Sequence, residues 1–156
     1  MNRQYLTSPV GLWEITAGET GLRSIRPVFT SKPDLPNVWT EKAVQCLKAY
    51  FAGAPVLFDL PLALEGSPFC RLVWEALAKI PYGQVITYGE LAATIGRPTA
   101  CRAVANAVGK NPLLILLPCH RVVASNGIGG FSAGLPLKRF LLELEGVKIT
   151  ENTPIF

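Results

Sequence analysis

The sequence predicts an α+β fold, with a small N-terminal α/β lobe followed by a mostly helical C-terminal part. Two observations lead to this prediction. The first thirty residues alternate β-like runs with turn residues, and the residues after position 66 contain several segments with helical spacing of apolar side chains. The chain has 156 residues, of which 49% are hydrophobic and 17% charged. This composition excludes a disordered protein and suffices for one domain or two small lobes.

The N-terminal lobe is expected to begin with a β-hairpin. Residues 11–16 and 22–25 alternate apolar and polar side chains and are separated by a turn that contains two glycines. Residues 27–37 contain three prolines, which indicates a connecting loop. Residues 39–51 have apolar side chains at helical spacing and predict one helix. Residues 56–62 are compatible with one more strand.

The C-terminal part is expected to begin with a helix, and it carries all of the net charge. Ser67 followed by Pro68 is typical of a helix N-cap, and residues 69–80 show helical spacing of apolar side chains. Residues 1–66 contain six Lys or Arg and six Asp or Glu, whereas residues 67–156 contain nine and five. The net charge of +4 in the second part favours a polyanion, such as nucleic acid, as its partner.

Two further short helices have the outline of a helix-turn-helix. Thr87 and Glu90 match the capping-box pattern and open the first helix, which is expected to end at Gly96. The second is predicted over residues 99–108, where alanines accompany one long cation, Arg102. A helix that reads bases in the major groove needs several polar side chains, so this one favours sequence-independent contact with the backbone and minor groove. The outline also fits two helices that simply pack together.

The cysteine pattern does not indicate a disulfide framework or a metal site. None of the four cysteines belongs to a C-x-x-C pair, and the chain contains a single histidine, His120. The longest apolar run, residues 113–117, is too short to cross a bilayer, and the N-terminus lacks the apolar stretch of a signal peptide. We therefore expect a cytoplasmic protein that binds no metal and does not enter a membrane.

Cys119 is the candidate nucleophile. It lies between Pro118 and His120, directly after the apolar run. A thiol reacts as its thiolate, so an adjacent imidazole suggests activation; the alternative is a buried cysteine beside a surface histidine. Neighbouring side chains of an extended segment face opposite sides, so the two can cooperate only if the chain bends there or a water carries the proton. The adjacency argues against a papain-type protease, whose histidine is distant in sequence.

From about residue 67 to 146, the sequence resembles the O6-alkylguanine-DNA alkyltransferases, also called methylated-DNA–protein-cysteine methyltransferases. Several separated motifs in the order of that family carry the resemblance. They are residues 118–123 (PCHRVV), residues 83–88 (GQVITY), the helix with Arg102, Asn111-Pro112, the glycine-rich loop 127–134 and residues 141–146 (LLELEG).

The resemblance implies two lobes. Residues 1–65 would form an α/β lobe with a mostly antiparallel, ribonuclease-H-like sheet. Residues 66–156 would form a mostly helical lobe for DNA binding and alkyl transfer, with a winged-helix-like helix-turn-helix. The implied function is repair of duplex DNA. The protein would bind the minor groove, rotate O6-alkylguanine out of the stack and accept its alkyl group irreversibly. The resemblance does not decide whether O4-alkylthymine is a second substrate. The resemblance implies no cofactor. It implies a monomer that would be located on the nucleoid when it is bound to DNA, and it leaves open whether several molecules assemble cooperatively on DNA.

The resemblance also assigns roles to individual residues. Cys119 would be the alkyl acceptor, His120 the base that acts through a water, and Glu145 the group that orients His120. Asn111 would be a hinge, and Arg102 would fill the gap left by the extruded base. Tyr88 would help to rotate the phosphate and would donate a hydrogen bond to the base in the pocket. The backbone of Val122 and of Ser132 would read the guanine edge, and Phe131 would line the pocket.

Some positions depart from the family pattern. Phe131 stands where tyrosine is usual, Ala133 where glycine is frequent, Leu114 where proline can occur and Cys101 where alanine is common.

Two other functional classes are the alternatives to an alkyltransferase: non-enzymatic lesion-binding relatives, and a DNA-binding regulator that uses the helix-turn-helix alone. The lesion-binding relatives commonly have tryptophan in place of the signature cysteine, so Cys119 argues against that class.

Overall fold

The structure, a computed structural model, describes residues 1–150 and 153–155. It divides into two compact units. One contains Met1–Glu65 and Pro112–Leu116, and the other contains Gly66–Asn111 and Leu117–Phe156. The first unit contains an antiparallel sheet and a helix, and the second contains mainly helices, so the predicted α+β fold is confirmed.

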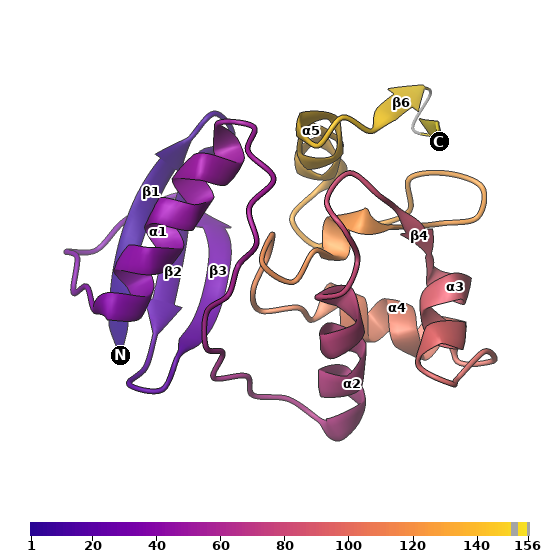
Figure 1. The fold of residues 1–156 in the computed structure, drawn as a ribbon, viewed down its shortest axis with the longest axis horizontal. Helices are drawn as coiled ribbons and strands as arrows, with labels where there is room; N and C mark the ends of the chain where they lie inside the picture. The colour runs from indigo at the N-terminus through magenta and orange to yellow at the C-terminus, as the bar shows by residue number, and fades with distance from the viewer. Residues whose placement is uncertain (151–152, 156) are drawn as a thin grey trace. The chain divides into compact units, whose positions relative to one another are not determined.

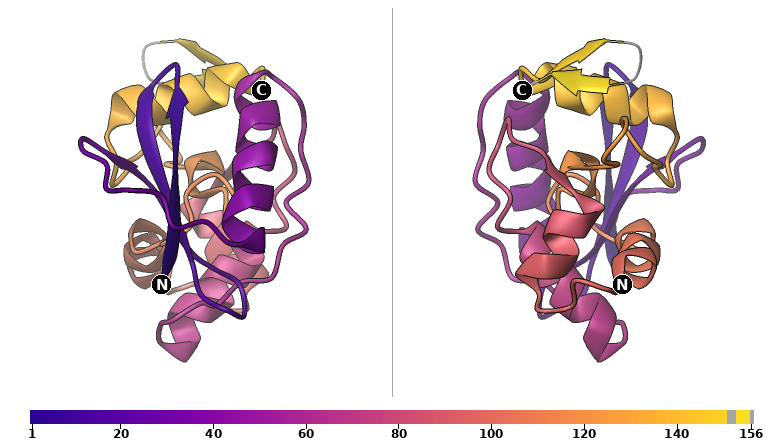
Figure 2. Two further views of the ribbon diagram at one scale, coloured as in Figure 1. Left: turned by 90° about the vertical axis from the view of Figure 1, so that its left-hand side faces the viewer. Right: turned by 90° about the vertical axis from the view of Figure 1, so that its right-hand side faces the viewer.

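The first unit is a three-stranded antiparallel sheet in the order β1 (Asn2–Ser8), β2 (Gly11–Ala17) and β3 (Leu22–Val28). Helix α1 (Val38–Phe51) lies against one face of this sheet, as Figures 1 and 2 show. Strands β2 and β3 form the predicted hairpin. Strand β1 has only one buried residue, so its sequence does not alternate apolar and polar side chains. Its polar composition explains why this strand was not predicted.

Helix α1 forms where it was predicted, because both its cap and its apolar face are present. Asn37 accepts hydrogen bonds from the backbone at positions 39 and 40, and the Thr40 side chain completes a capping box. The helix buries Leu47 and Tyr50 in the same core as Trp13 of β2.

Residues 56–62 do not form the additional strand that their apolar content suggested. They are irregular, with one isolated bridge between Leu22 and Leu62. A different segment pairs with β3: Ile25 donates its N–H to the Pro112 carbonyl at 2.9 Å and accepts from Leu114 at 3.1 Å. The apolar run before Cys119 is therefore buried, with no strand assigned.

The second unit contains three helices that pack against one another: α2 (Pro68–Leu77), α3 (Tyr88–Thr94) and α4 (Cys101–Gly109). Thr87 and Glu90 form the predicted capping box of α3. Gly96, with φ +73°, turns the chain after α3. Helix α4 begins two residues later than expected, and its N-cap residue, Ala100, supplies no side-chain hydrogen bond.

The remaining elements of this unit surround the signature segment. A one-turn 3₁₀-helix, η1 (Cys119–Arg121), leads into β5 (Val122–Val123), which pairs in parallel with β4 (Ile86–Thr87). Helix α5 (Leu135–Leu144) follows, and β6 (Lys148–Thr150) and β7 (Thr153–Ile155) form a terminal hairpin. Among the described residues, no helix is both long and apolar enough to span a bilayer.

Candidate active site

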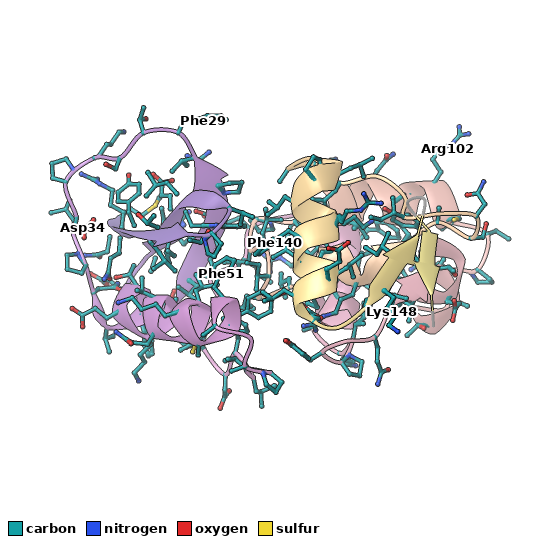
Figure 3. All side chains as sticks on the ribbon, turned by 90° about the horizontal axis from the view of Figure 1, so that it is seen from above. Phe29, Asp34, Phe51, Arg102, Phe140 and Lys148 are labelled. Carbon is teal, nitrogen blue, oxygen red and sulfur yellow. The ribbon has the colours of Figure 1, made fainter. Side chains whose placement is uncertain are left out.

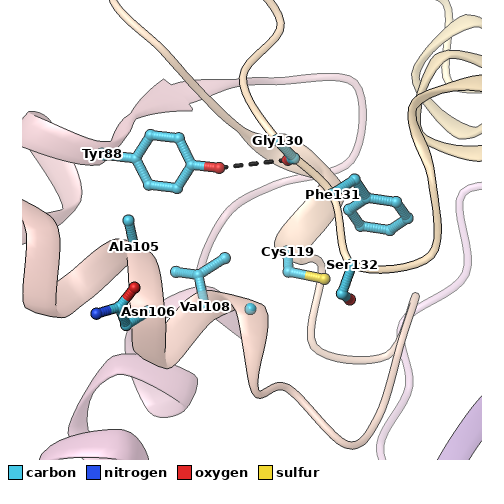
Figure 4. A pocket seen from close by; sticks show the side chains of 9 residues that line it. Tyr88, Ala105, Asn106, Val108, Cys119, Gly130, Phe131 and Ser132 are labelled. Atoms are coloured by element: carbon cyan, nitrogen blue, oxygen red, sulfur yellow. Dashed lines mark hydrogen bonds between the residues drawn. The ribbon is translucent and has the colours of Figure 1, made fainter.

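A pocket of about 350 Å³ opens in the second unit between α4, α3, η1 and the loop that follows β5. Figure 4 shows Cys119 reaching toward Ser132 in this pocket, with Tyr88 and Phe131 placed around it. The residues that line it are Tyr88, Ala105, Asn106, Val108, Gly109, Cys119, Gly130, Phe131 and Ser132. The structure therefore brings together four of the sequence-predicted site residues, from three separate parts of the chain.

The chain bends at Cys119, as cooperation with His120 required. Cys119, His120 and Arg121 form the one-turn helix η1, so their side chains leave the backbone in three different directions. Cys119 is 3% exposed and lines the pocket, while His120 is fully buried and reaches Glu145. Without this turn, the two side chains would lie on opposite faces of an extended segment.

Burial keeps the Cys119 thiol protonated in the resting protein. Desolvation raises its pKa from 9.0 to about 11, and this outweighs a hydrogen bond from Asn111 and the positive charge of Lys138, which act in the opposite direction. At such a pKa, only about one molecule in ten thousand carries the thiolate at pH 7. A neighbouring base is therefore needed to generate the nucleophile.

His120 and Glu145 form a short hydrogen bond, with Nε2 of the imidazole 2.6 Å from Oε2 of the carboxylate. Complete burial lowers the pKa of His120 below 6.5, so the imidazole is neutral at pH 7. Desolvation by burial would raise the pKa of Glu145, but hydrogen bonds from His120, Arg121 and the Gly83 N–H outweigh it, and the pKa is about 2. An ionised carboxylate can only accept, so Nε2 carries the hydrogen and Nδ1 keeps the lone pair that can take a proton.

Arg121 holds the same carboxylate from the other side. Its Nε lies 2.8 Å from Oε1 of Glu145, and its Nη2 lies 3.1 Å from Oε2. Its Nη1 donates to the Ile80 carbonyl at 2.6 Å, and the Gly83 N–H donates to Oε1 at 2.9 Å. This bidentate pair fixes the position of the Glu145 carboxylate and, through it, the ring of His120.

Asn111 follows α4 and its C-cap residue, Lys110. Its side chain is buried and donates from Nδ2 to the Leu117 carbonyl at 2.7 Å. The same side chain hydrogen-bonds to Cys119 and acts to lower the pKa of its thiol. Asn111 thus connects the end of α4 to the segment that carries the thiol.

Tyr88, Phe131 and Ser132 line the pocket, whereas Val122 is not among its lining residues. The Tyr88 hydroxyl donates to the Gly130 carbonyl at 3.4 Å, and burial raises the pKa of this phenol, so it keeps its proton. Val122 is completely buried in β5. Ala133 is not among the described lining residues, and Leu114 is buried in the first unit.

Arg102 does not line the pocket. It is exposed on α4, and Figure 3 shows its side chain extending away from the helix. Arg97 in the turn before α4 and Lys110 after it are exposed as well. Together they give the helix-turn-helix a positively charged surface.

Sequence reasoning missed Lys138, which is fully buried on α5. Its ammonium donates to the Val122 carbonyl at 2.6 Å and to the Gly130 carbonyl at 2.9 Å. A signal was available: Lys138 shares the i, i+3, i+4 spacing of the buried Leu141 and Leu142, so a charged residue occupies the apolar face of its helix. No group of three or more metal-ligating side chains occurs among the described residues.

The chain matches two family models along nearly its whole length. Residues 1–64 match the ribonuclease-like domain of 6-O-methylguanine DNA methyltransferase, and residues 68–147 match its DNA-binding domain. A methylated-DNA–protein-cysteine methyltransferase of Methanosarcina acetivorans is 44% identical over 147 residues, which cover 89% of this chain and 94% of the relative. An enzyme of the same name from Mycolicibacterium paratuberculosis is 44% identical over 145 residues, or 88% of each chain.

Among solved structures, the Mycobacterium tuberculosis OGT in complex with DNA superposes with a TM-score of 0.83 at 39% identity. The superposition covers 93% of this chain and 92% of that one.

Proposed function

Because the chain belongs to the 6-O-methylguanine DNA methyltransferase family, we propose that it repairs DNA by moving the alkyl group of O6-alkylguanine onto Cys119. The observation that carries this proposal is a thiol at the wall of a pocket, backed by a buried imidazole and carboxylate. The alternative of a non-enzymatic lesion-binding protein is not favoured, because Cys119 is present and the relatives that match most of the chain are named methyltransferases.

The transfer begins with removal of the thiol proton. His120 accepts it through a water at Nδ1, while Nε2 stays hydrogen-bonded to Glu145. The thiolate attacks the alkyl carbon in line with the C–O6 bond: an S–C bond forms, the C–O6 bond breaks, and its electron pair goes to the guanine. The guanine anion then takes a proton from water, and His120 returns the proton of the thiol to water, which restores the neutral imidazole. The hydroxyl of Tyr88 keeps its proton and can donate to the departing base, which lowers the barrier.

The reaction ends after one turnover. A thioether is a poor leaving group, so the alkyl group stays on Cys119. Each molecule would therefore repair one lesion. The protein is an enzyme by its chemistry and a reagent by its stoichiometry.

We further propose that DNA binds along α3 and α4 through its minor groove. A base inside a duplex cannot reach a buried thiol, so the lesion must be rotated out of the stack. Arg102 would occupy the space that the base leaves, and Arg97 and Lys110 would contact phosphates. Residues 66–156 would form the lobe that binds DNA and transfers the alkyl group, and residues 1–65 would form the N-terminal α/β lobe. We expect a monomer located in the cytoplasm and on the nucleoid when bound.

Incubation with a duplex oligonucleotide that contains O6-methylguanine should add one methyl group per protein molecule. Peptide mass spectrometry should find it on the peptide that contains Cys119, and the oligonucleotide should contain guanine afterwards. An unmodified oligonucleotide is the control. Recovery of the lesion intact after stoichiometric binding would support a lesion-binding protein instead. A parallel oligonucleotide with O4-methylthymine tests whether the pocket accepts the pyrimidine.

Replacing Arg102 with alanine should slow repair of duplex DNA at least about tenfold, because unstacking a base costs a few kcal/mol that the side chain helps to offset. Reaction with the free base O6-methylguanine, which needs no extrusion, should keep its rate. Arg71→Ala, on the exposed side of α2, serves as the matched loss of one arginine. Equal slowing of duplex and free-base reactions would exclude a role for Arg102 in extrusion.

A further inference from the structure

We propose that Asn106 determines a sequence preference of the repair reaction: its side-chain amide contacts the minor-groove edge of a base pair next to the lesion and favours a pair that contains guanine. The inference deepens the proposed function, on which it rests for the reaction and for the groove that is bound. Repair would then be faster in some sequence contexts than in others.

Asn106 belongs both to the pocket and to the exposed face of α4. It lines the pocket that contains Cys119, and Figure 4 shows its amide directed away from the thiol. The residue is exposed to solvent, and in the described part of the chain its side-chain amide forms no hydrogen bond. The amide is therefore available to a ligand at the mouth of the pocket.

Asn106 and Arg102 are the long polar side chains of the exposed face of α4. They are four residues apart, so they lie on the same side of the helix, whereas Val104, Ala107 and Val108 are buried on the other side. The neighbouring positions on the exposed face carry alanine or glycine, which let the helix approach a groove closely. Asn106 is thus the uncharged hydrogen-bonding group that α4 presents beside Arg102.

The spacing of these two residues is comparable with that of neighbouring base pairs. Four residues of an α-helix advance about 6 Å, and consecutive base pairs are about 3.4 Å apart along the duplex axis. With Arg102 in the gap left by the extruded base, Asn106 lies within about two base-pair steps of that gap, whichever way the helix lies along the groove. A base pair next to the lesion is therefore within reach of its amide.

An amide can distinguish base pairs in the minor groove. Purine N3 and pyrimidine O2 accept hydrogen bonds in every pair, whereas the N2 amino group of guanine is the donor that marks a G·C pair. The Asn106 amide offers Nδ2 as a donor and Oδ1 as an acceptor, whereas the Arg102 guanidinium can only donate. Oδ1 therefore finds a partner only beside a G·C pair, and one such neutral hydrogen bond changes an equilibrium about fivefold.

The test measures the second-order rate constant of methyl transfer from duplexes that differ in one amino group. A guanine next to O6-methylguanine is replaced by inosine, which lacks N2, and an adenine there by 2,6-diaminopurine, which carries it. Each position beside the lesion is tested in each strand. At one of them, the wild type should react about fivefold more slowly after the change to inosine and about fivefold faster after the change to 2,6-diaminopurine.

The stability of the duplex acts in the opposite direction. An inosine–cytosine pair has one hydrogen bond fewer than a guanine–cytosine pair, so extrusion of the neighbouring base should become easier. A 2,6-diaminopurine–thymine pair has one more than an adenine–thymine pair, so extrusion should become harder. Slower repair beside inosine and faster repair beside 2,6-diaminopurine therefore cannot result from a change in duplex stability.

Two variants assign the preference to the amide. Asn106→Leu keeps the approximate shape of asparagine without its polar atoms, and Asn106→Ala truncates the side chain at an exposed helical position that alanine suits. Both should transfer the methyl group at equal rates beside guanine and beside inosine. Gln45→Ala, which removes an exposed amide from α1, should keep the preference of the wild type.

Equal rates of the wild type beside guanine and inosine at every position would overturn the proposal. A preference that persists in either Asn106 variant would overturn it as well, because the amide would then not be its source. Reaction of each variant with the free base O6-methylguanine shows whether its active site is intact. Absence of methyl transfer from every duplex and from the free base would instead contradict the proposed function.

Discussion

Cys119→Ser is expected to bind DNA that contains O6-methylguanine and to leave the methyl group in place. Serine differs by one atom, so the pocket and the backbone of η1 should persist. A hydroxyl is far less acidic and less polarizable than a thiol, and the buried imidazole cannot ionise it. We expect the transfer rate to fall by at least about 10⁴-fold, measured by methyl incorporation into protein under single-turnover conditions.

Two further variants make this result specific. Cys46 and Cys70 are half-buried and do not line the pocket, so Cys46→Ser and Cys70→Ser should transfer at the wild-type rate. Binding of the Cys119→Ser variant is measured separately by fluorescence anisotropy at two salt concentrations, because phosphate contacts should weaken with salt. Methyl transfer to any other cysteine in the Cys119→Ser variant would mean that the acceptor has been misassigned.

Glu145→Gln should impair both stability and transfer. The amide fits the same space but cannot neutralise Arg121, whose guanidinium would remain buried without its counter-ion. Breaking one side of such a pair typically costs about 3–5 kcal/mol. The amide can also donate to Nε2 of His120, which would favour the tautomer with hydrogen on Nδ1, and transfer should slow by about 10²–10⁴-fold.

The contribution of Glu145 to the free energy of unfolding depends on pH in a definite direction. The pKa of Glu145 is lowered from 4.5 to about 2 in the folded protein, so its stabilising effect is complete above about pH 4.5 and disappears as the pH falls toward 2. Urea unfolding between these limits should show the wild type losing stability more steeply than Glu145→Gln. Glu143→Gln, at an exposed position of α5, should change stability by less than about 0.5 kcal/mol. Parallel stability curves for wild type and Glu145→Gln would contradict the assigned carboxylate.

Local signals in the sequence predicted the elements that depend on local interactions. Thr87 with Glu90 and Ser67 with Pro68 mark helix starts because a cap is formed by residues that are close in sequence. Strand β1 pairs with the next strand, β2, but its mostly polar residues leave no apolar alternation in the sequence. Residues 56–62 contact the sheet through a single bridge between Leu62 and the distant Leu22, which a single sequence does not reveal. The same limit applies to the irregular path of residues 113–117, where Ile115 has φ +72°.

The site shows a similar division. Cys119 and His120 were identified because they are adjacent and because the chain has one histidine. The resemblance then pointed to Glu145, and the structure places it 2.6 Å from His120. Lys138 and the second function of Arg121 as a clamp on Glu145 were not predicted, because their partners lie on other elements and follow only from tertiary packing. The individual roles of the site residues remain predictions for the experiments above.

The nearly complete enclosure of Cys119 has a consequence for the lifetime of the protein. A protein that reacts once must keep its thiol unmodified until it meets a rare lesion, in a cell that contains peroxides and other electrophiles. Oxidation proceeds through accessible thiolates, and this sulfur is 3% exposed with a pKa of about 11. The low reactivity of the buried, protonated thiol protects Cys119 from oxidation before it meets a lesion, whereas the exposed Cys101 is accessible to oxidants in solution.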